Sequence, residues 1–137
     1  MKLKILKKAK IVITIFIFYF SLNSYSQNSE WVVPDNVSYI ENPYANDAKA
    51  LEKGKKIYEK LCTSCHGELG KGDGPASITL NPKPADHQSD IVQMQSDGAI
   101  YWKLSTGKGL MSPYKDLLSK TERWQLVTYI RKLGESN

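Results

Sequence analysis

The residues best suited to carry chemistry lie in one short stretch, Cys62-Thr63-Ser64-Cys65-His66, which contains both cysteines of the chain. On one helical turn, two thiols three positions apart can each add to a vinyl group of the same porphyrin, and the adjacent histidine is then held against the iron. The pattern C-x-x-C-H is the attachment sequence of c-type haem. The stretch therefore predicts one covalently bound haem c per chain, with Cys62 and Cys65 as attachment sites and His66 as an axial ligand of the iron.

Two other kinds of site use similar cysteine pairs. A structural zinc site needs four cysteine or histidine ligands, but outside this stretch the chain has no cysteine and one further histidine, His87. A thioredoxin-like redox site needs alternating strands and helices around its cysteines, and the flanking sequence does not indicate them. Because an exported compartment would normally oxidise a free pair, a redox disulfide stays an alternative to haem attachment.

The sixth ligand of the iron decides whether the haem carries electrons or binds a small molecule. Met111, Met94 and His87 are the candidate side chains, and an open or water-bound position is the remaining alternative. Met111 lies in the glycine-containing segment 107–114 between two expected helices, where an irregular backbone can bring its thioether to the haem. Paired methionine and histidine ligands are typical of cytochromes c. We therefore expect Met111 to be the sixth ligand.

One helix is expected to lead directly into the attachment stretch. Apolar residues repeat at helical spacing over 51–61, and Asn46 or Asp47 could cap the helix. Gly54 is unfavourable in a helix interior by about 1 kcal/mol relative to Ala, so another backbone is expected to approach it closely. After the stretch, glycines and prolines over 67–84 exclude long regular structure.

Two further helices are expected nearer the C-terminus. A capping box at 119–122 begins a helix over 120–133, whose apolar residues follow the helical template. A shorter helix is expected over 99–106, with Asp97 as cap and Gly107 as stop. Since no alternating strand pattern is evident, the fold class is all-α with long loops.

The charge distribution predicts export rather than nucleic-acid binding. The chain has a formal net charge of +5, but five lysines and no acid fall in its first ten residues. An apolar stretch over 11–20 and a small-residue cleavage site at 24–26 follow, as in a signal peptide. Without residues 1–26 the chain has 14 basic and 14 acidic residues. An uncleaved membrane anchor is the alternative, although the apolar stretch is shorter than the roughly 20 residues that span a bilayer.

In their order along the chain, five stretches resemble a class I monohaem cytochrome c of the small exported bacterial kind. They are residues 54–58, the attachment stretch extended to Gly67, the glycine-rich run 70–75, the Met111 loop and residues 124–131. The similarity covers about residues 47–133, and the earlier segments Trp31-Val32-Val33-Pro34 and Asn42-Pro43-Tyr44 also fit such proteins. The resemblance implies the cytochrome c fold, with three to five helices and long loops around one covalent haem. Together with the export signal, this predicts three parts of the chain: a signal peptide (1–26), an N-terminal extension (27–46) and a cytochrome c domain (47–137).

The resemblance also implies particular contacts. Gly54 and Tyr58 should meet Leu126 and Tyr129 where the first and last helices cross. A proline carbonyl should accept the Nδ1 proton of His66, and the sequence offers Pro75 and Pro82. The candidates for the apolar wall around the haem are Tyr58, Tyr101, Trp102, Leu104, Tyr114 and Trp124.

These residues predict a single-electron carrier rather than an enzyme, because two axial ligands leave the iron no position for a substrate. It would shuttle electrons between periplasmic or membrane redox proteins after export, with transient or peripheral membrane association and no nucleic-acid partner. A fixed electron-transfer subunit of a respiratory or reductase complex is the main alternative. A haem enzyme or sensor with an open distal site is a further one.

Overall fold

The computed structural model describes residues 31–135 of the chain, and the described residues from 32 onward form one compact unit. The expected signal peptide lies outside the described residues. Across residues 31–135, none of the helices combines the length and the apolar character that crossing a membrane requires.

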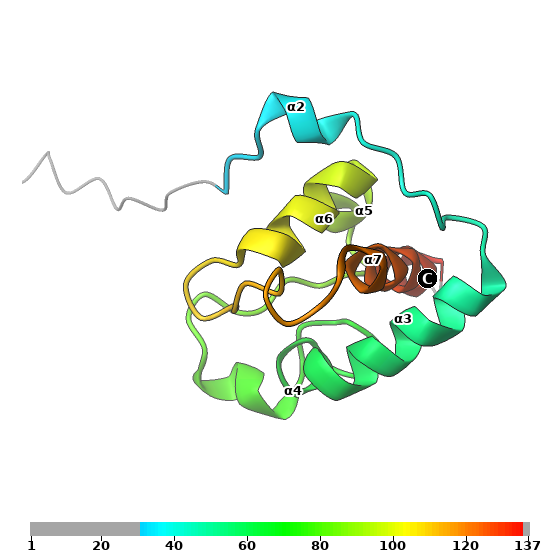
Figure 1. Ribbon diagram of the computed structural model, residues 1–137. Helices are drawn as coiled ribbons and strands as arrows, with labels where there is room; N and C mark the ends of the chain where they lie inside the picture. The colour runs from blue at the N-terminus through cyan, green and yellow to red at the C-terminus, as the bar shows by residue number, and fades with distance from the viewer. Residues whose placement is uncertain (1–30, 136–137) are drawn as a thin grey trace, which may run out of the picture. The chain divides into compact units, whose positions relative to one another are not determined.

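Helices and loops make up the described part of the chain, which has six α-helices, one 3-10 helix and no β-strand (Figure 1). In chain order they are α2 (Asp35–Ser38), α3 (Ala48–Leu61), α4 (Thr63–His66), η1 (Pro75–Thr79), α5 (Asp90–Gln93), α6 (Asp97–Thr106) and α7 (Lys120–Gly134). The expected all-α class is confirmed. The α-helices exceed the expected three to five because α2, α4 and α5 have four residues each, too few for a periodic pattern.

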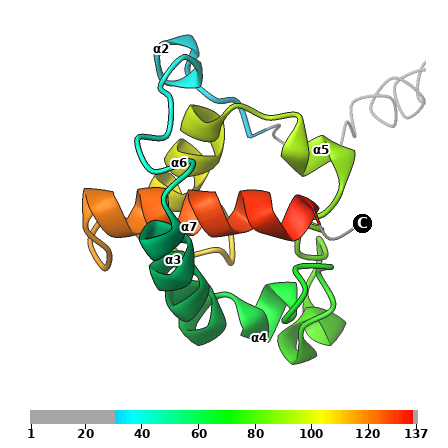
Figure 2. The ribbon, with the colours of Figure 1, turned by 90° about the vertical axis from the view of Figure 1, so that its right-hand side faces the viewer.

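The two longest helices, α3 and α7, cross at close range (Figure 2). Gly54 lies at the crossing, where an added Cβ atom would overlap the backbone carbonyl of Gln125 and come within 3.1 Å of the Tyr129 Cβ atom. The ring of Tyr58 lies 5.2 Å from that of Tyr129, centroid to centroid, and Leu126 belongs to the same buried cluster as Tyr58. The expected crossing is confirmed, and Gln125 is the residue whose backbone requires the glycine.

The helix ends follow local signals in the sequence. The side chain of Asp47 accepts hydrogen bonds from two backbone N–H groups of α3, and the expected capping box of α7 is present between Ser119 and Glu122. Helix α6 begins earlier than expected, because the Ser96 side chain caps it by accepting from the Ala99 N–H group. The Asp97 carboxylate instead accepts a hydrogen bond from Arg131 at 2.7 Å.

The segment before α3 packs against the C-terminal helices. Asn42 is buried, and its side-chain amide donates to the Thr128 hydroxyl at 2.9 Å and to the Trp124 carbonyl at 3.3 Å. Its side-chain oxygen accepts from the Tyr44 N–H group. The part of the expected N-terminal extension that follows Trp31 thus belongs to the same compact unit as the helices.

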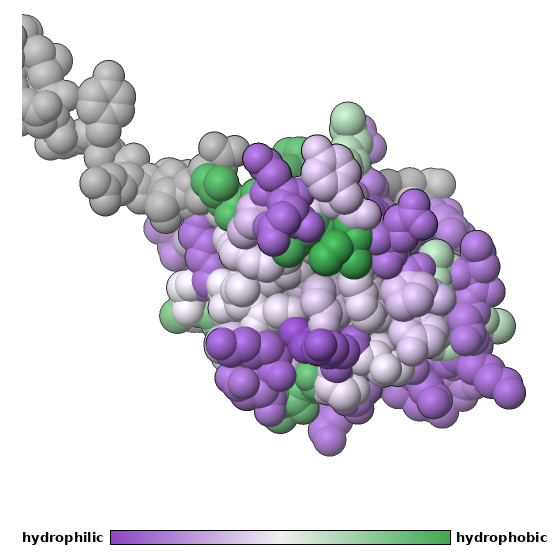
Figure 3. Space-filling view, turned by 45° about the horizontal axis from the view of Figure 1, so that its top comes forward, coloured by the Kyte–Doolittle hydropathy of each residue, from purple (hydrophilic) through white to green (hydrophobic). Residues whose placement is uncertain are grey.

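On the face shown in Figure 3, hydrophobic side chains gather in small patches among polar ones.

Candidate functional site

Both cysteines are placed by the transition from α3 to the single turn of α4. Cys62 follows α3 directly, and its N–H group donates to the Tyr58 carbonyl, which extends the hydrogen-bonding pattern of that helix. The His66 N–H group in turn donates to the Cys62 carbonyl at 2.8 Å. Residues three apart on one helical turn project to the same side, so Cys62 and Cys65 share a face. Cys62 is buried, Cys65 is half-buried, and no disulfide joins the two.

The Cys62 thiol is not an activated nucleophile. Burial raises its pKa to about 12, and the neighbouring Cys65 contributes to the same shift. Redox-active C-x-x-C sites work through a thiol whose pKa is lowered by positive charge or a helix N-terminus. The environment of Cys62 therefore disfavours the thioredoxin-like alternative.

His66 is held by a backbone carbonyl. Its Nδ1 atom lies 2.9 Å from the carbonyl oxygen of Ala85. Since a carbonyl can only accept, Nδ1 carries the proton and donates it, which leaves the lone pair on Nε2 available for a metal. Burial lowers the pKa of His66, while the hydrogen bond to Ala85 acts in the opposite direction.

The expectation of a proline carbonyl at this contact is wrong. The acceptor belongs to Ala85, not to Pro75 or Pro82. Pro75 is the first residue of η1, and Pro82 precedes the accepting carbonyl by three residues. The proline-containing turn over 81–84 brings the residue after it against the His66 ring, so the prolines shape the backbone without supplying the acceptor.

The glycine-rich run after His66 folds back over the attachment stretch. The N–H group of Gly72 donates to the His66 carbonyl at 2.8 Å, and that of Gly74 donates to the Cys65 carbonyl at 3.2 Å. A Cβ atom on Gly74 would overlap the backbone carbonyls of the α4 turn. The glycine is required because two backbones meet there, and their hydrogen bonds keep the α4 turn in place.

The three candidates for the sixth ligand lie in different surroundings. Met111 is half-buried and packs against the hydrophobic core cluster. Two backbone hydrogen bonds between Lys108 and Met111, at 2.9 and 3.0 Å, close its loop. Met94 follows α5 with 85% of its surface exposed. The His87 ring stacks on His66, with centroids 4.1 Å apart, so it lies beside the expected axial ligand.

Apolar side chains from several elements gather around the same core. Tyr101 of α6 stacks on Trp124 of α7, with ring centroids 4.0 Å apart. The hydroxyl of Tyr114 donates to the Leu61 carbonyl at the end of α3 and thereby ties the Met111 loop to the helix that precedes Cys62. Of the expected wall residues, Tyr58 and Leu104 are buried, while Tyr101, Trp102, Tyr114 and Trp124 are half-buried.

Comparison with known proteins identifies the family. A family model described as cytochrome c oxidase, cbb3-type, subunit III, matches residues 49–130. The chain belongs to this family. Haem c, bound covalently, is therefore the cofactor of this cytochrome.

Individual relatives agree with this membership. The cytochrome is 28% identical to cytochrome c-L of Methylorubrum extorquens over 94 residues, which are 68% of this chain and 45% of that protein. The chain thus spans less than half the length of that curated relative.

Solved structures show the same fold. A chain from the reducing HAO-like protein complex of Kuenenia stuttgartiensis matches with a TM-score of 0.55 and 32% identity, covering 63% of this cytochrome and 44% of that chain. Cytochrome cL of Methylophaga aminisulfidivorans matches with a TM-score of 0.50 and 24% identity, covering 67% of this cytochrome and 60% of that chain. The expected cytochrome c fold is confirmed.

The donor set of this cytochrome fits haem and does not fit a protein-bound metal ion. Two cysteines and a histidine whose Nε2 lone pair is available stand within five residues, as attachment through vinyl groups and ligation of iron require. Within residues 31–135, no group of three or more His, Cys, Asp or Glu side chains is arranged to hold a metal ion. The half-buried aromatic side chains Tyr101 of α6 and Trp124 of α7 add apolar surface next to the core cluster that contains Cys62.

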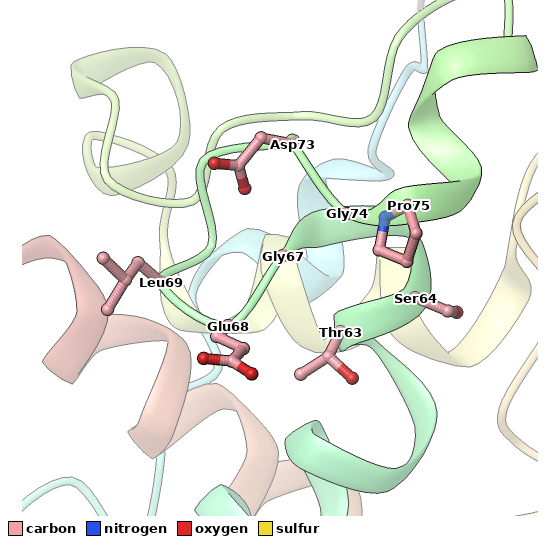
Figure 4. A pocket seen from close by; sticks show the side chains of 8 residues that line it. All are labelled: Thr63, Ser64, Gly67, Glu68, Leu69, Asp73, Gly74 and Pro75. Atoms are coloured by element: carbon pink, nitrogen blue, oxygen red, sulfur yellow. The ribbon is translucent and has the colours of Figure 1, made fainter.

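A hollow of about 610 Å³ lies between the α4 turn and the glycine-rich run (Figure 4). It is lined by Thr63, Ser64, Gly67, Glu68, Leu69, Asp73, Gly74 and Pro75. None of the four expected haem residues contributes to this lining, and two exposed carboxylates border it. The hollow is therefore not the cofactor site.

Two residues beside the site were not found from the sequence. Ala85 acts through its backbone oxygen, which any residue would supply, so no side-chain pattern indicates it. His87 was considered as an iron ligand, but it stacks on His66 and lies 3.3 Å, at Nδ1, from the Tyr58 hydroxyl. The available signal is a histidine three residues after the proline-containing turn, and only the three-dimensional arrangement shows that it stacks on His66.

Proposed function

We propose that this cytochrome is a single-electron carrier in which Cys62 and Cys65 hold one haem c by thioether bonds, and His66 and Met111 ligate its iron. When bound there, haem supplies an iron that changes by one electron between the ferrous and ferric states. The side chains hold the porphyrin, fix both ligands and limit the access of water. The cytochrome would not be an enzyme, because His66 and Met111 together would leave the iron no position for a substrate.

The observation that carries this proposal is the hydrogen bond from Nδ1 of His66 to the Ala85 carbonyl. It fixes the tautomer in which Nε2 can bind a metal, and it does so at the residue next to Cys65. Histidines that bind a metal through one ring nitrogen usually donate the other ring N–H group to a carbonyl or carboxylate in this way. The raised pKa of the buried Cys62 thiol argues against thiol exchange at this pair, which is the competing use of the two cysteines.

Met111 is supported as the sixth ligand by its position. Its loop is closed by its own backbone hydrogen bonds and tied by Tyr114 to the end of α3, next to Cys62. Met94 would have to leave an exposed position to reach the iron. A thioether ligand in an apolar setting raises the reduction potential of the haem, which suits a protein that must accept electrons readily.

Absorption spectra of the purified protein in both oxidation states test the assignment. We expect the ferric protein to show the near-infrared charge-transfer band of methionine ligation. Met111→Ala should abolish the band, while Met94→Ala, the matched control, should leave it unchanged. A Met111→Ala protein with the wild-type ferric spectrum would overturn the Met111 assignment and favour an open site or another ligand.

The site of action is proposed to be the periplasm, with transient or peripheral contact between the carrier and the membranes or proteins that it serves. The lysine-rich start of the chain and the following apolar stretch support export. Mass spectrometry of the protein from cells should find an N-terminus near Gln27 and one haem per chain. An intact N-terminal segment would indicate a membrane-tethered carrier.

A fixed subunit of a larger redox complex is the second candidate. The family description names an oxidase subunit, and one of the solved structures comes from a multi-protein complex. Size-exclusion chromatography of a mild detergent extract distinguishes the two. Elution at the mass of the single chain supports the diffusing carrier, whereas co-elution of the haem stain with a larger assembly supports the fixed subunit.

A further inference from the structure

His87 is a buried side chain for which the electron-carrier mechanism has no role. Only 9% of its surface is exposed. Its ring lies almost parallel to that of His66, with a centroid distance of 4.1 Å and an angle of 19° between the planes. The contact covers one face of the proposed iron ligand with a flat aromatic surface.

The position of His87 is fixed from two directions. Its backbone N–H group donates to the Gly70 carbonyl at 2.6 Å, and its Nδ1 atom lies 3.3 Å from the Tyr58 hydroxyl. That hydroxyl has one hydrogen, which it donates to the Gly67 carbonyl at 3.1 Å. Nδ1 of His87 must then be the donor in its contact with Tyr58. The same hydrogen bonds fix the tautomer of His87 and the plane of its ring.

The loop around His87 is built to let the ring reach this place. Gly70 has a φ of 79°, and a Cβ atom there would come within 3.1 Å of the His87 Cβ atom and 2.9 Å of Leu133. The side-chain amide of Gln93 donates to the carbonyls of His87 and Ile130, at 2.5 and 3.0 Å. The segment that carries His87 is therefore attached both to the glycine-rich run and to α7.

Ala85 and His87 restrict different rotations of the His66 ring. The hydrogen bond from Nδ1 of His66 to the Ala85 carbonyl sets the direction in which Nε2 points, but a single hydrogen bond lets the ring turn about the N–H···O line. A parallel ring in contact with one face opposes that turning. We propose that His87 is a positioning residue that sets the ring plane of His66. This inference rests on the proposed function, in which His66 is an axial ligand.

The ring plane of an axial imidazole can be measured directly in a ferric haem protein. The unpaired electron of the low-spin iron spreads into the porphyrin in a direction set by that plane, so the four haem methyl resonances shift apart in a characteristic order. His87→Phe keeps a flat ring and removes the donor to Tyr58, whereas His87→Leu is similar in volume and removes the flat ring. We expect His87→Phe to keep the wild-type methyl order and His87→Leu to change the order or the spread.

Two results would overturn the proposal. If His87→Leu keeps the wild-type methyl pattern, the stacked ring does not set the plane of His66. If His87→Phe and His87→Leu change the pattern to the same extent, the hydrogen bond to Tyr58 is responsible and the stacking is not. A merely structural role would lower stability in both variants without moving the methyl resonances.

A measurement on the wild-type protein covers the case in which His87→Leu fails to fold. In the ferrous, diamagnetic protein, nuclear Overhauser cross-peaks are expected between the ring protons of His66 and His87, and their absence would overturn the proposal. A haem-stained denaturing gel and the near-infrared band are recorded on the same sample. If haem or methionine ligation is missing, the proposed function fails, while the cross-peaks still report on the ring contact.

Discussion

The crossing of α3 and α7 makes Gly54→Ala a sharp test of the fold, because two physical effects of this substitution have opposite signs. In an exposed helix interior, alanine is favoured over glycine by about 1 kcal/mol. At this position, however, the added Cβ atom would lie within 3.0 Å of both the carbonyl carbon and the carbonyl oxygen of Gln125. Helix propensity alone therefore predicts a more stable protein, and the close approach predicts a less stable one.

The close approach should dominate. The overlapping atoms belong to the backbone of α7, so no side chain can rotate away, and the Tyr129 Cβ atom at 3.1 Å blocks a sideways shift. Overpacking a tight contact costs about 1 to 3 kcal/mol, and a backbone contact belongs at the upper end of that range. After the gain in propensity, we expect the free energy of unfolding to fall by about 2 kcal/mol. For a domain of this size the melting temperature should fall by roughly 10 °C.

Guanidinium unfolding of the ferric holoprotein, followed by circular dichroism, measures the effect. Lys53→Ala is the control, because this exposed residue precedes Gly54 in the same helix and should change the free energy of unfolding by less than about 0.5 kcal/mol. The slope of the transition should be the same in all three proteins. A Gly54→Ala protein as stable as the wild type, or more stable, would refute the close packing of the two helices.

Three further predictions follow from single contacts. Cys62→Ser should lose most of its covalent haem, because one thioether bond is removed, and wild-type staining on a haem-stained gel would contradict the attachment assignment. Asn42→Ala removes the polar contacts that tie the N-terminal segment to α7 and should lower the free energy of unfolding by about 2 kcal/mol; an unchanged denaturation midpoint would show that these contacts are absent in solution. Asp97→Asn weakens the charged contact with half-buried Arg131 and should lower the free energy of unfolding by about 1 kcal/mol, with less effect at high salt. An equal loss of stability at all salt concentrations would contradict this electrostatic origin.

The parts of the fold that the sequence predicted are those with local signals. Helix α7 has a capping box and an apolar stripe, and α3 has an acidic cap and an apolar face, so both could be located without knowledge of the rest. Gly54 predicted a close helix crossing, because an unfavourable residue inside an otherwise good helix indicates that another backbone packs closely against it. The attachment stretch is also local, since its chemistry depends on a spacing within one helical turn.

The parts that could not be predicted depend on residues far apart in the chain. Ser96 and Asp97 can both cap a helix. Ser96 is the cap, because the Asp97 carboxylate accepts a hydrogen bond from Arg131, which lies 34 residues after Asp97. The acceptor for His66 is a backbone atom of Ala85, 19 residues away, and a backbone atom leaves no mark in the sequence. In both cases the ambiguity was settled by a tertiary hydrogen bond and not by propensity.

The two proposed axial ligands are supported in different ways. The surroundings of His66 draw on three separate segments: the α4 turn, the glycine-rich run that bonds back to it, and the segment of Ala85 and His87. The loop of Met111 is closed by two backbone hydrogen bonds of its own, and it is joined to the rest of the fold at Tyr114, whose N–H group donates to the Leu104 carbonyl and whose hydroxyl donates to the Leu61 carbonyl. A change of the sixth ligand needs changes in one short loop, whereas a change around His66 disturbs the contacts of three segments. The histidine side of the proposed site is thus the more widely connected one, and a substitution at Met111 is expected to disturb the fold less than one around His66.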